Sequence, residues 1–368
     1  MGYTFMMLRH GQAVIVGPGA RVSLVATLRN EAATIAPWLA ALERQTRVPD
    51  EVVLVDGGST DQTLGILRDW AARTPLPATV RSAPGTNISA GRNVAIAAAT
   101  GDIIAVTDGG AIADPRWLEE LCEGFADGEA DAVSGFYVAG GETWFERTLT
   151  VAITPQLAEI DPEDFLPSSR SVAFTKAAWE AVGGYPEWLD HCEDLVFDLA
   201  LRRAGGRFAF RPSGVVTWNG RSSLWAFGRQ YFLYARGDGI AGLWPLRHAA
   251  RYSAYAVGPA LLVLGASYPP LLLVAAAGLV AHCRRSWVRL RRAPPSRSAA
   301  GRAAAYLLVP AIVVTGDLAK MAGYVAGRAL RRRRLTAAGK RRRWPATADL
   351  SGPGGGVEDE REQSVATS

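Results

Sequence analysis

Cysteine and histidine are scarce in this sequence of 368 residues. There are three cysteines (Cys122, Cys192 and Cys283), far apart and without a Cys-x-x-Cys pair, and four histidines without metal-ligand spacing. Disulfide frameworks and zinc sites need such ligands in clusters. The composition therefore argues against a disulfide-stabilised fold and a zinc hydrolase, and it fits a reducing compartment.

Several motifs of common enzyme classes are also missing. The sequence has neither the Gly-x-Ser-x-Gly turn of esterases nor the Gly-rich Lys-Ser/Thr loop of nucleotide triphosphatases. VGPGA and DGGST lack the three-glycine spacing of a dinucleotide fingerprint. The first twenty residues lack the uninterrupted apolar core of a signal peptide, and we expect residues 1–20 to be a flexible leader.

Acidic residues are almost absent from one part of the chain. The net charge is +5, yet between Arg247 and Arg343 nineteen Lys and Arg residues occur with a single acid, Asp317. The remainder is therefore acidic, and the sequence predicts an acidic body followed by a basic tail.

The body alternates strand and helix patterns. Compact apolar runs at 22–28, 51–56 and 102–108 are typical of buried strands, and apolar residues at helical spacing follow or precede them at 30–45, 63–73 and 88–101. Ser59 or Thr60 is available to cap the helix at 63–73. This alternation predicts an α/β domain at 21–245, with a mostly parallel sheet flanked by helices.

Two strands end in a carboxylate followed by glycine. Asp56 closes EVVLVD before Gly57, and Asp108 closes DIIAVTD before Gly109 and Gly110. Open α/β sheets bind ligands beyond the carboxyl ends of their strands. We therefore expect both acids to lie at a binding site.

The composition changes near residue 250. Residues 252–283 contain no charge, and 303–330 are apolar apart from Asp317 and Lys320. About twenty apolar residues cross a bilayer core, so we expect a membrane-associated helical region at 246–330 with one to three segments. The Pro269-Pro270 pair in residues 252–283 allows either one kinked helix or a hairpin of two short helices. Basic residues on both sides of this segment favour the hairpin under the positive-inside rule.

The flanking arginines suit anionic lipid headgroups, each contributing about 1 kcal/mol near the surface. Nucleic-acid binding is the rival explanation for such basic runs, but their position beside apolar segments favours lipid. Residues 331–368 are predicted to be a basic and then disordered tail.

Five motifs occur in order: VATLRNEAATI, VDGGSTD, ISAGRNVAIAAATGDIIAVTDGGA, AVGGY and CEDLVFDLALRRAG. Together they resemble glycosyltransferase family 2 on the GT-A type Rossmann-like fold, over about residues 20–240. The resemblance implies transfer of a sugar from a nucleotide-diphosphate donor to an acceptor hydroxyl, with inversion at the anomeric carbon.

The resemblance assigns a donor site to the strand ends. Asp108 matches the first acid of the family's Asp-x-Asp element, which serves the ribose and a divalent cation, whereas Gly110 replaces the last acid. Three arrangements are therefore possible. Asp108 alone could hold Mg²⁺ or Mn²⁺ together with water and phosphate oxygens, Asp114 could supply a second carboxylate, or arginines could replace the metal. The residues matched to nucleotide-sugar binding are Thr27, Arg29, Glu31, Asp56, Arg92, Asn93 and Asp108.

Each of these residues also has a purely structural interpretation. Asp56 could cap a helix, and Glu31 could be a first-turn acid favoured by the helix dipole. Arg92, matched to a phosphate or ribose partner, could form a surface ion pair.

Catalysis requires a base that takes the acceptor's proton. Glu193 and Asp194 match the family's acidic pair before a helix, so we expect Asp194 to be the general base and Glu193 to support it or orient the acceptor. The alternative is that both acids have only a structural role at the start of the helix, where the helix dipole stabilises them. His191, three residues before Asp194, is a weaker candidate for the base.

Residues 217–239 resemble the family's Gln-x-x-Arg-Trp element without its tryptophan. Gln230, Tyr234 and Arg236, with Tyr231, would then bind the acceptor sugar, because aromatic rings suit sugar faces. An amphipathic helix whose aromatics anchor the domain at a membrane surface is the equal alternative.

We therefore expect an inverting glycosyltransferase at the cell membrane, with its catalytic domain in the cytoplasm. It would use a nucleotide-sugar donor and a lipid-linked or cell-envelope glycan acceptor. It would also contact anionic membrane lipids, and we expect no binding of nucleic acid. The alternatives are a polyprenyl-phosphate glycosyltransferase and a non-catalytic nucleotide-sugar-binding membrane scaffold.

Overall fold

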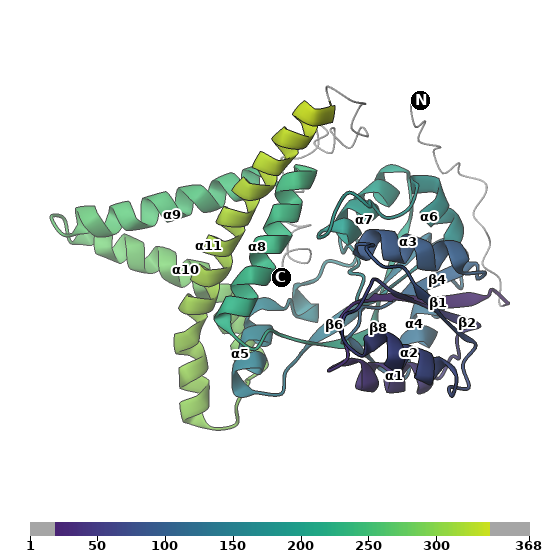
Figure 1. Cartoon of the computed structure of the whole chain (residues 1–368). Helices are drawn as coiled ribbons and strands as arrows, with labels where there is room; N and C mark the ends of the chain where they lie inside the picture. Colours follow the sequence, from purple (N-terminus) through teal and green to yellow (C-terminus); the bar gives the residue numbers. More distant parts are fainter. Residues whose placement is uncertain (1–18, 339–368) are drawn as a thin grey trace. The chain divides into compact units, whose positions relative to one another are not determined.

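The computed structural model describes residues 19–338. Contacts divide the chain into two compact units, each of which combines two stretches of sequence (Figure 1). Among the described residues, the sheet unit contains residues 19–138 and 157–218, and the helical unit contains residues 139–156 and 219–338. The predicted leader at 1–20 falls almost entirely outside the described residues, as does the tail beyond residue 338.

In the part of the chain that the structure describes, the sheet has eight strands in the order β3-β2-β1-β4-β7-β6-β8-β5. In chain order they are β1 Val22–Leu28, β2 Glu51–Asp56, β3 Ala78–Ser82, β4 Ile103–Val106, β5 Ile112–Ala113, β6 Ala132–Gly140, β7 Val172–Thr175 and β8 Phe208–Asn219.

One half of this sheet is parallel and the other is mixed with antiparallel pairs. β1 pairs in parallel with β2 and β4, and β2 pairs in parallel with β3. β7 is antiparallel to β4 and β6, and β5 is antiparallel to β8. The α/β class is confirmed, whereas "mostly parallel" describes only the first half, because β7 runs antiparallel to both of its neighbours and β5 runs antiparallel to β8.

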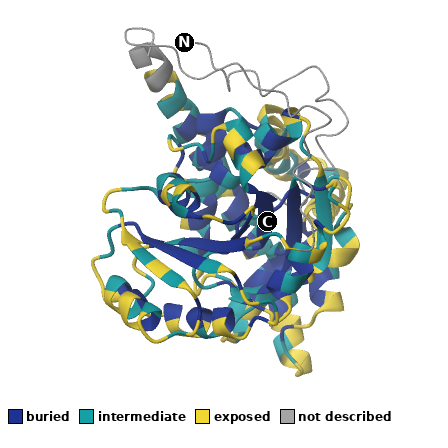
Figure 2. Ribbon diagram, turned by 90° about the vertical axis from the view of Figure 1, so that its right-hand side faces the viewer, coloured by how far each residue is buried: buried dark blue, intermediate teal, exposed yellow. Residues whose placement is uncertain are grey.

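Helices cover both faces of the sheet. Trp38, Leu42 and Trp117 belong to the buried cluster on one face, and Ile96 and Phe197 belong to the cluster on the other. Figure 2 shows the buried strands in dark blue between helices with exposed outer faces. Each such side chain contributes about 1.5–3 kcal/mol on burial. The helices of the sheet unit are α1 Ile35–Glu43, α2 Thr63–Ala71, α3 Ile88–Ala98, α4 Trp117–Glu123, α6 Lys176–Val182 and α7 Glu193–Arg203, with a short 3₁₀ turn at Leu157–Glu159.

The predicted cap of α2 is wrong. The helix begins at Thr63 after Gln62, and no side chain caps it. Ser59 and Thr60 instead join the neighbouring loop: Ser59 Oγ accepts the Asn30 N–H at 2.9 Å, and the Thr60 N–H donates to Asn30 Oδ1 at 2.8 Å. Asn30 itself is left-handed, with φ 58°. The turns after β1 and β2 are therefore tied together.

Within residues 19–338, the helical unit contains five helices. Two of them, α9 and α10, form a hairpin across residues 266–269 (Figure 1), so the hairpin alternative is the one the fold adopts. Many large apolar side chains of this hairpin are exposed, among them Val263 and Leu273. Pro270–Arg292 and Ala299–Arg333 are long and apolar enough to cross a membrane. The helices are α5 Trp144–Ile153, α8 Leu224–Ala241, α9 Pro245–Gly265, α10 Pro270–Arg292 and α11 Ala299–Ala338.

α8 packs along α11 at glycine positions. A Cβ on Gly323 would lie 2.2 Å from the carbonyl oxygen of Phe232, and one on Gly327 would lie 2.2 Å from that of Arg236. This Gly-x-x-x-Gly pair lets the two backbones approach closely. The predicted domain boundary at residue 245 therefore differs from the packing, which groups α8 with the C-terminal helices.

Asp317 on α11 connects three helices of this unit. Its carboxylate accepts hydrogen bonds from Arg251 Nε at 2.9 Å and from Tyr255 at 3.2 Å, and it lies 2.7 Å from His282 Nε2. Arg251 and Tyr255 lie on α9 and His282 lies on α10. A buried acid is costly without such partners, so this cluster fixes how the three helices pack.

Candidate active site

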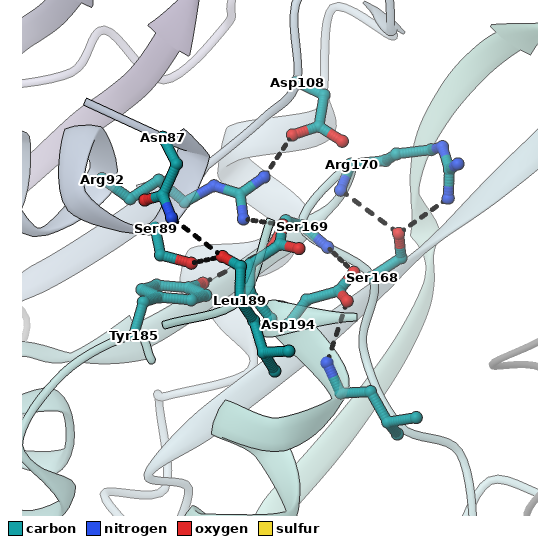
Figure 3. A network of polar contacts seen from close by, with 12 residues as sticks. Asn87, Ser89, Arg92, Asp108, Ser168, Ser169, Arg170, Tyr185, Leu189 and Asp194 are labelled. Atoms are coloured by element: carbon teal, nitrogen blue, oxygen red, sulfur yellow. Dashed lines mark hydrogen bonds and ion pairs between the residues drawn. The ribbon is translucent and has the colours of Figure 1, made fainter. Parts of the chain in front are cut away.

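A buried arginine organises the acids of the sheet unit. Arg92 on α3 is 2% exposed, and its guanidinium binds Asp108 Oδ1 at 2.7 Å (Figure 3). It also binds Glu193 Oε1 at 2.6 Å. The ring of Tyr185 lies 5.2 Å from its Cζ. One cation therefore joins the turn after β4 to the first residue of α7.

The charges of this group depend on one another. Burial alone would lower the pKa of Arg92, but Asp108 and Glu193 more than offset it, so the pKa is raised and the guanidinium stays charged. Burial raises the pKa of Glu193 to about 7, although Arg92 acts in the opposite direction. Burial and the charge of Asp194 raise the pKa of Asp198, one turn further along α7.

Asp194 differs from its neighbour Glu193 in exposure. It is half-buried, whereas Glu193 is 6% exposed. Asp194 Oδ1 accepts the N–H of Leu195 at 2.9 Å, and Oδ2 accepts that of Ser169 at 3.5 Å. Backbone donors thus hold an accessible carboxylate, while Glu193 is bound internally to Arg92.

The chain enters α7 through a left-handed residue. Cys192, immediately before Glu193, has φ 62°, a conformation that costs a non-glycine residue about 1–3 kcal/mol. Such backbone fixes the direction in which the helix starts, and with it the two acids at its first positions. His191 is half-buried in the same turn.

Asp56 lies at the predicted strand end and binds its own loop. It is 1% exposed, and its Oδ2 accepts the N–H groups of Gly58 at 3.0 Å and Ser59 at 3.1 Å. Gly58 is left-handed, with φ 92°. The carboxylate therefore holds the turn, and its predicted contact with a base or ribose stays a prediction.

Asn93 connects α3 to the Gly-Gly-Tyr turn after α6. Its amide nitrogen donates to the carbonyl of Tyr185 at 2.9 Å, and its oxygen accepts the N–H of Tyr185 at 2.9 Å and Trp179 Nε1 at 3.1 Å. A Cβ on Gly184 would lie 2.8 Å from that oxygen. Asn93 therefore fixes this turn, and a role in nucleotide binding stays a prediction.

The remaining predicted donor residues lie in and after β1. Thr27 packs against Gly91 of α3, where a Cβ would lie 2.4 Å from Thr27 Cγ2, and its Oγ1 has no hydrogen-bond partner among the described residues. Arg29 is exposed. Glu31 accepts the hydroxyl of Thr34 at 2.7 Å, but α1 begins only at Ile35 and has no acid in its first turn, so the interpretation of Glu31 as a first-turn acid is wrong.

A divalent cation fits this site only with ligands from outside the chain. Among residues 19–338 no three His, Cys, Asp or Glu side chains gather as a metal site. One oxygen of Asp108 binds Arg92, and Gly110, with φ 84°, offers no ligand. Asp114 is exposed and accepts the N–H of Arg116 at 3.0 Å, as a local turn does. Mg²⁺ accepts such a site, because it often uses one carboxylate together with substrate phosphates and waters.

The predicted acceptor residues lie on α8 in the helical unit. Gln230 is 7% exposed, accepts Arg221 Nε at 3.1 Å and donates to the Tyr234 hydroxyl at 2.6 Å. Tyr231 packs on Phe227, with ring centroids 4.3 Å apart, and Lys320 Nζ lies 4.5 Å from its ring centre. Arg236 is half-buried. These contacts account for part of the motif as helix packing, and sugar binding stays a prediction.

Several residues of the site have no signal in the sequence. Ser169 reaches Asp194 through its backbone, and Arg170 follows it in a loop without regular periodicity. Tyr185 stands within a predicted motif, but its contact with Arg92 depends on the packing of α3. Asp198 shares a helix with Asp194, so its spacing of four residues could have drawn attention to it.

Comparisons with known proteins agree with this geometry. Residues 23–176 match the model of glycosyl transferase family 2. The chain is 28% identical over 222 residues to the succinoglycan biosynthesis protein ExoA of Rhizobium meliloti (strain 1021), covering 56% of this chain and 66% of ExoA. It is 24% identical over 186 residues to the O-antigen chain rhamnosyltransferase WbaN of Salmonella anatum, covering 47% of this chain and 58% of WbaN. The chain thus spans less than two thirds of either relative.

The fold is also similar to a solved structure. The mannosyltransferase PcManGT from Pyrobaculum calidifontis, in complex with GDP-Man and Mn²⁺, superposes with a TM-score of 0.51 at 21% identity, over 81% of this chain and 86% of that one. At this identity the likeness concerns the fold. Residues 23–176 therefore form a glycosyl transferase family 2 domain on a GT-A fold, within a chain whose relatives are glycan-building proteins.

Proposed function

We propose that the chain is an inverting glycosyltransferase that moves a sugar from a nucleotide-diphosphate sugar to a lipid-linked or cell-envelope glycan. The observation that carries the proposal is the pairing of a half-buried Asp194 with a buried Glu193 bound to Arg92. One acid is accessible for proton transfer and the other is held inside, so adjacent carboxylates have separate tasks.

In the proposed reaction Asp194 accepts the proton of the acceptor hydroxyl as that oxygen attacks the anomeric carbon. The bond between this carbon and the diphosphate oxygen breaks, and its electron pair leaves with the nucleoside diphosphate. A general base of this kind contributes about 10²–10⁴-fold to the rate. When bound, Mg²⁺ or Mn²⁺ supplies charge for the leaving diphosphate. Arg92 positions Asp108 and Glu193 and keeps their negative charges balanced.

The names of the relatives support the substrate classes. ExoA is named for succinoglycan biosynthesis and WbaN for rhamnose transfer to O-antigen chains, and PcManGT is described with GDP-Man and Mn²⁺. A nucleotide sugar and a surface glycan are therefore the favoured donor and acceptor for this chain.

We further infer that the helical unit associates with the cell membrane, with the catalytic unit in the cytoplasm. The exposed apolar side chains of the α9–α10 hairpin, such as Leu262, Val263 and Leu273, support insertion into lipid. Arg284, Arg285 and their basic neighbours follow the apolar stretch and favour a cytoplasmic position under the positive-inside rule.

Calorimetry on the full-length chain in detergent tests the donor class. UDP, GDP and TDP are titrated, each with Mg²⁺, with Mn²⁺ and with a chelator. The proposal predicts binding of at least one nucleoside diphosphate, and the preferred base narrows the donor. If none of the three binds under any of these conditions, the nucleotide-sugar proposal is wrong.

A further inference from the structure

The distal part of the α9–α10 hairpin is apolar and exposed on all sides. We call residues 256–281 the hairpin arm, and Figure 1 shows it extending away from α8 and α11. Within the arm only Gly265 is buried, and a Cβ on it would lie 2.5 Å from Leu272 Cδ2 of the other helix. The arm has no charged residue, and Val263 and Leu273 are 73% and 74% exposed. A continuous apolar surface of this kind marks an interaction with an apolar partner.

Charged residues begin where the hairpin arm ends. Arg251 precedes the arm on α9, and Arg284 and Arg285, both exposed, follow it on α10. The carboxylate of Asp317 binds Arg251 at 2.9 Å and lies 2.7 Å from His282, so both helices of the hairpin start from the same polar cluster. Basic side chains attract anionic headgroups. An apolar arm with basic residues at both ends therefore fits a lipid bilayer, with the ends at the headgroups and the arm in the hydrocarbon.

The hairpin arm is too short to cross this hydrocarbon. At 1.5 Å per residue, α9 extends about 15 Å beyond Tyr255, and α10 covers about 18 Å from its first residue to His282. Beyond that point α10 is held against α5, where the Ser286 hydroxyl donates to the Ala152 carbonyl at 2.9 Å. The hydrocarbon core of a bilayer is about 30 Å thick. An arm whose base lies at the headgroups thus reaches about the middle of the bilayer.

The turn at the tip of the arm satisfies its own backbone donors. The N–H groups of Ala266, Ser267 and Tyr268 donate to carbonyls in the last turn of α9 at 2.9–3.2 Å. Pro269 and Pro270, which complete the turn, have no N–H group. Unpaired backbone donors are costly in hydrocarbon, where no water can replace the missing partner. The tip can therefore stay inside the bilayer.

α11 lies along a helix that is too polar to enter lipid. Among residues 19–338 only α10 and α11 are long and apolar enough to cross a membrane, and α8 is not. α11 packs on α8 from Gly316, where a Cβ would lie 3.1 Å from Phe227, to Gly327, where it would lie 2.2 Å from the carbonyl oxygen of Arg236. A crossing α11 would carry α8 into the hydrocarbon with the charges of Arg236 and Asp238, which are costly there. The two helices therefore stay outside the hydrocarbon together.

We propose that the hairpin arm enters a single leaflet of the bilayer and returns to the same side, and that neither α10 nor α11 crosses the membrane. The partner of the arm is lipid hydrocarbon, and anionic headgroups lie at Arg284 and Arg285. Both units then stay on one side of the membrane, where a water-soluble nucleotide sugar and a membrane-bound acceptor can meet. This inference rests on the membrane association proposed above and adds the topology to it.

Labelling with a membrane-impermeant maleimide tests this topology on the full-length chain in bacterial membranes. Single cysteines are introduced at four exposed positions: Ala250 before the arm, Ser267 at its tip, and Ala299 and Ala329 near the two ends of α11. Each variant is labelled in spheroplasts and in inverted vesicles, and the labelling of the wild type at its own three cysteines is subtracted. We expect Ala250→Cys, Ala299→Cys and Ala329→Cys to label from the same face. Ser267→Cys should label from neither face until detergent opens the membrane.

Ala250→Cys is the matched control for Ser267→Cys, because both positions are exposed in the protein and only the second lies in the arm. Equal thermal midpoints in detergent show that the variants are folded. Labelling of Ser267→Cys without detergent, from either face, overturns the inference. Labelling of Ala299→Cys and Ala329→Cys from opposite faces overturns it as well.

Flotation of the wild type with anionic lipid vesicles separates the two levels of the proposal. If the wild type does not float, the proposed membrane association is wrong and this inference fails with it. If the wild type floats and the labelling contradicts the expected pattern, the membrane association stands and only the topology is wrong.

Discussion

Replacing Arg92 with methionine should destabilise the sheet unit strongly, and the cost should depend on pH. Methionine fills a similar volume without charge, so the main loss is the partner of two carboxylates. Asp108 is 34% exposed and water can solvate it in place of the guanidinium. The side chain of Glu193 is buried and cannot be solvated in the same way. Removing one partner of a buried ion pair costs about 3–5 kcal/mol, and the bond to Glu193 accounts for most of it.

The cost should be largest at neutral pH and above. Without Arg92 the pKa of Glu193 rises further, because burial is no longer opposed by a cation. Below the ordinary Glu pKa of about 4.5 the side chain is protonated in both the folded and unfolded states, so the ionic part of the cost disappears. For a unit of this size 1 kcal/mol corresponds to about 2–4 °C, which predicts a fall of about 10 °C in the thermal midpoint at pH 7.5.

Thermal unfolding of the full-length protein followed by tryptophan fluorescence measures this shift. Arg202→Met is the control, with an expected loss below about 1 kcal/mol for a half-buried arginine whose Cζ lies 5.7 Å from the ring centre of Phe208. The double variant Arg92→Met with Glu193→Gln should regain at least about 1 kcal/mol, because the uncompensated acid is gone. A fall of less than about 2 °C in Arg92→Met, or no recovery in the double variant, would refute the idea that Arg92 organises these acids.

Three further predictions concern other parts of the chain. Burial raises the folded-state pKa of Glu193 to about 7, so the free energy of unfolding should decrease by on the order of 3 kcal/mol as the pH rises from about 4.5 to 7. Glu193→Gln should remove this part of the pH dependence of unfolding. An unchanged pH profile would contradict the assignment. Gly327→Val should separate α8 from α11, because its Cβ would lie 2.2 Å from the carbonyl oxygen of Arg236. The control is Gly278→Val, at a position with open space. Faster proteolysis within residues 219–333 in Gly327→Val than in this control would support the prediction, and equal rates would contradict it. Replacing Leu262, Val263 and Leu273 with serine should lower the fraction of protein that floats with anionic lipid vesicles, whereas flotation equal to that of the wild type would exclude the hairpin as the main membrane contact.

Elements whose structure depends on residues adjacent in the sequence could be predicted from the sequence alone. β1 and β2 coincide with the predicted runs 22–28 and 51–56, because buried parallel strands are continuous apolar stretches. β3, at 78–82, was missed, since an edge strand that is half exposed lacks such a stretch. The antiparallel return of the later strands depends on chain reversals that no local pattern encodes.

For the candidate site, too, single residues could be predicted but contacts between distant parts of the chain could not. The motifs identified Arg92, Asp108 and Glu193 individually, but not that one guanidinium binds both acids, although Glu193 lies 101 residues from Arg92 in the sequence. The Gly323–Gly327 spacing was missed in the sequence, although small residues four apart share one helix face and could have indicated helix packing.

Transfer of a labelled sugar tests the central claim most directly. The full-length wild type and Asp194→Asn are reconstituted in vesicles with envelope lipids as acceptors, and each is given the nucleotide sugars of the base that the wild type binds. We predict that Asp194→Asn loses transfer by about 10²–10⁴-fold while its nucleoside-diphosphate affinity stays unchanged. Asp190→Asn, which removes an exposed acid from the preceding turn, should retain transfer. Wild-type transfer by Asp194→Asn would contradict the account and favour an acceptor that is already anionic, such as a polyprenyl phosphate.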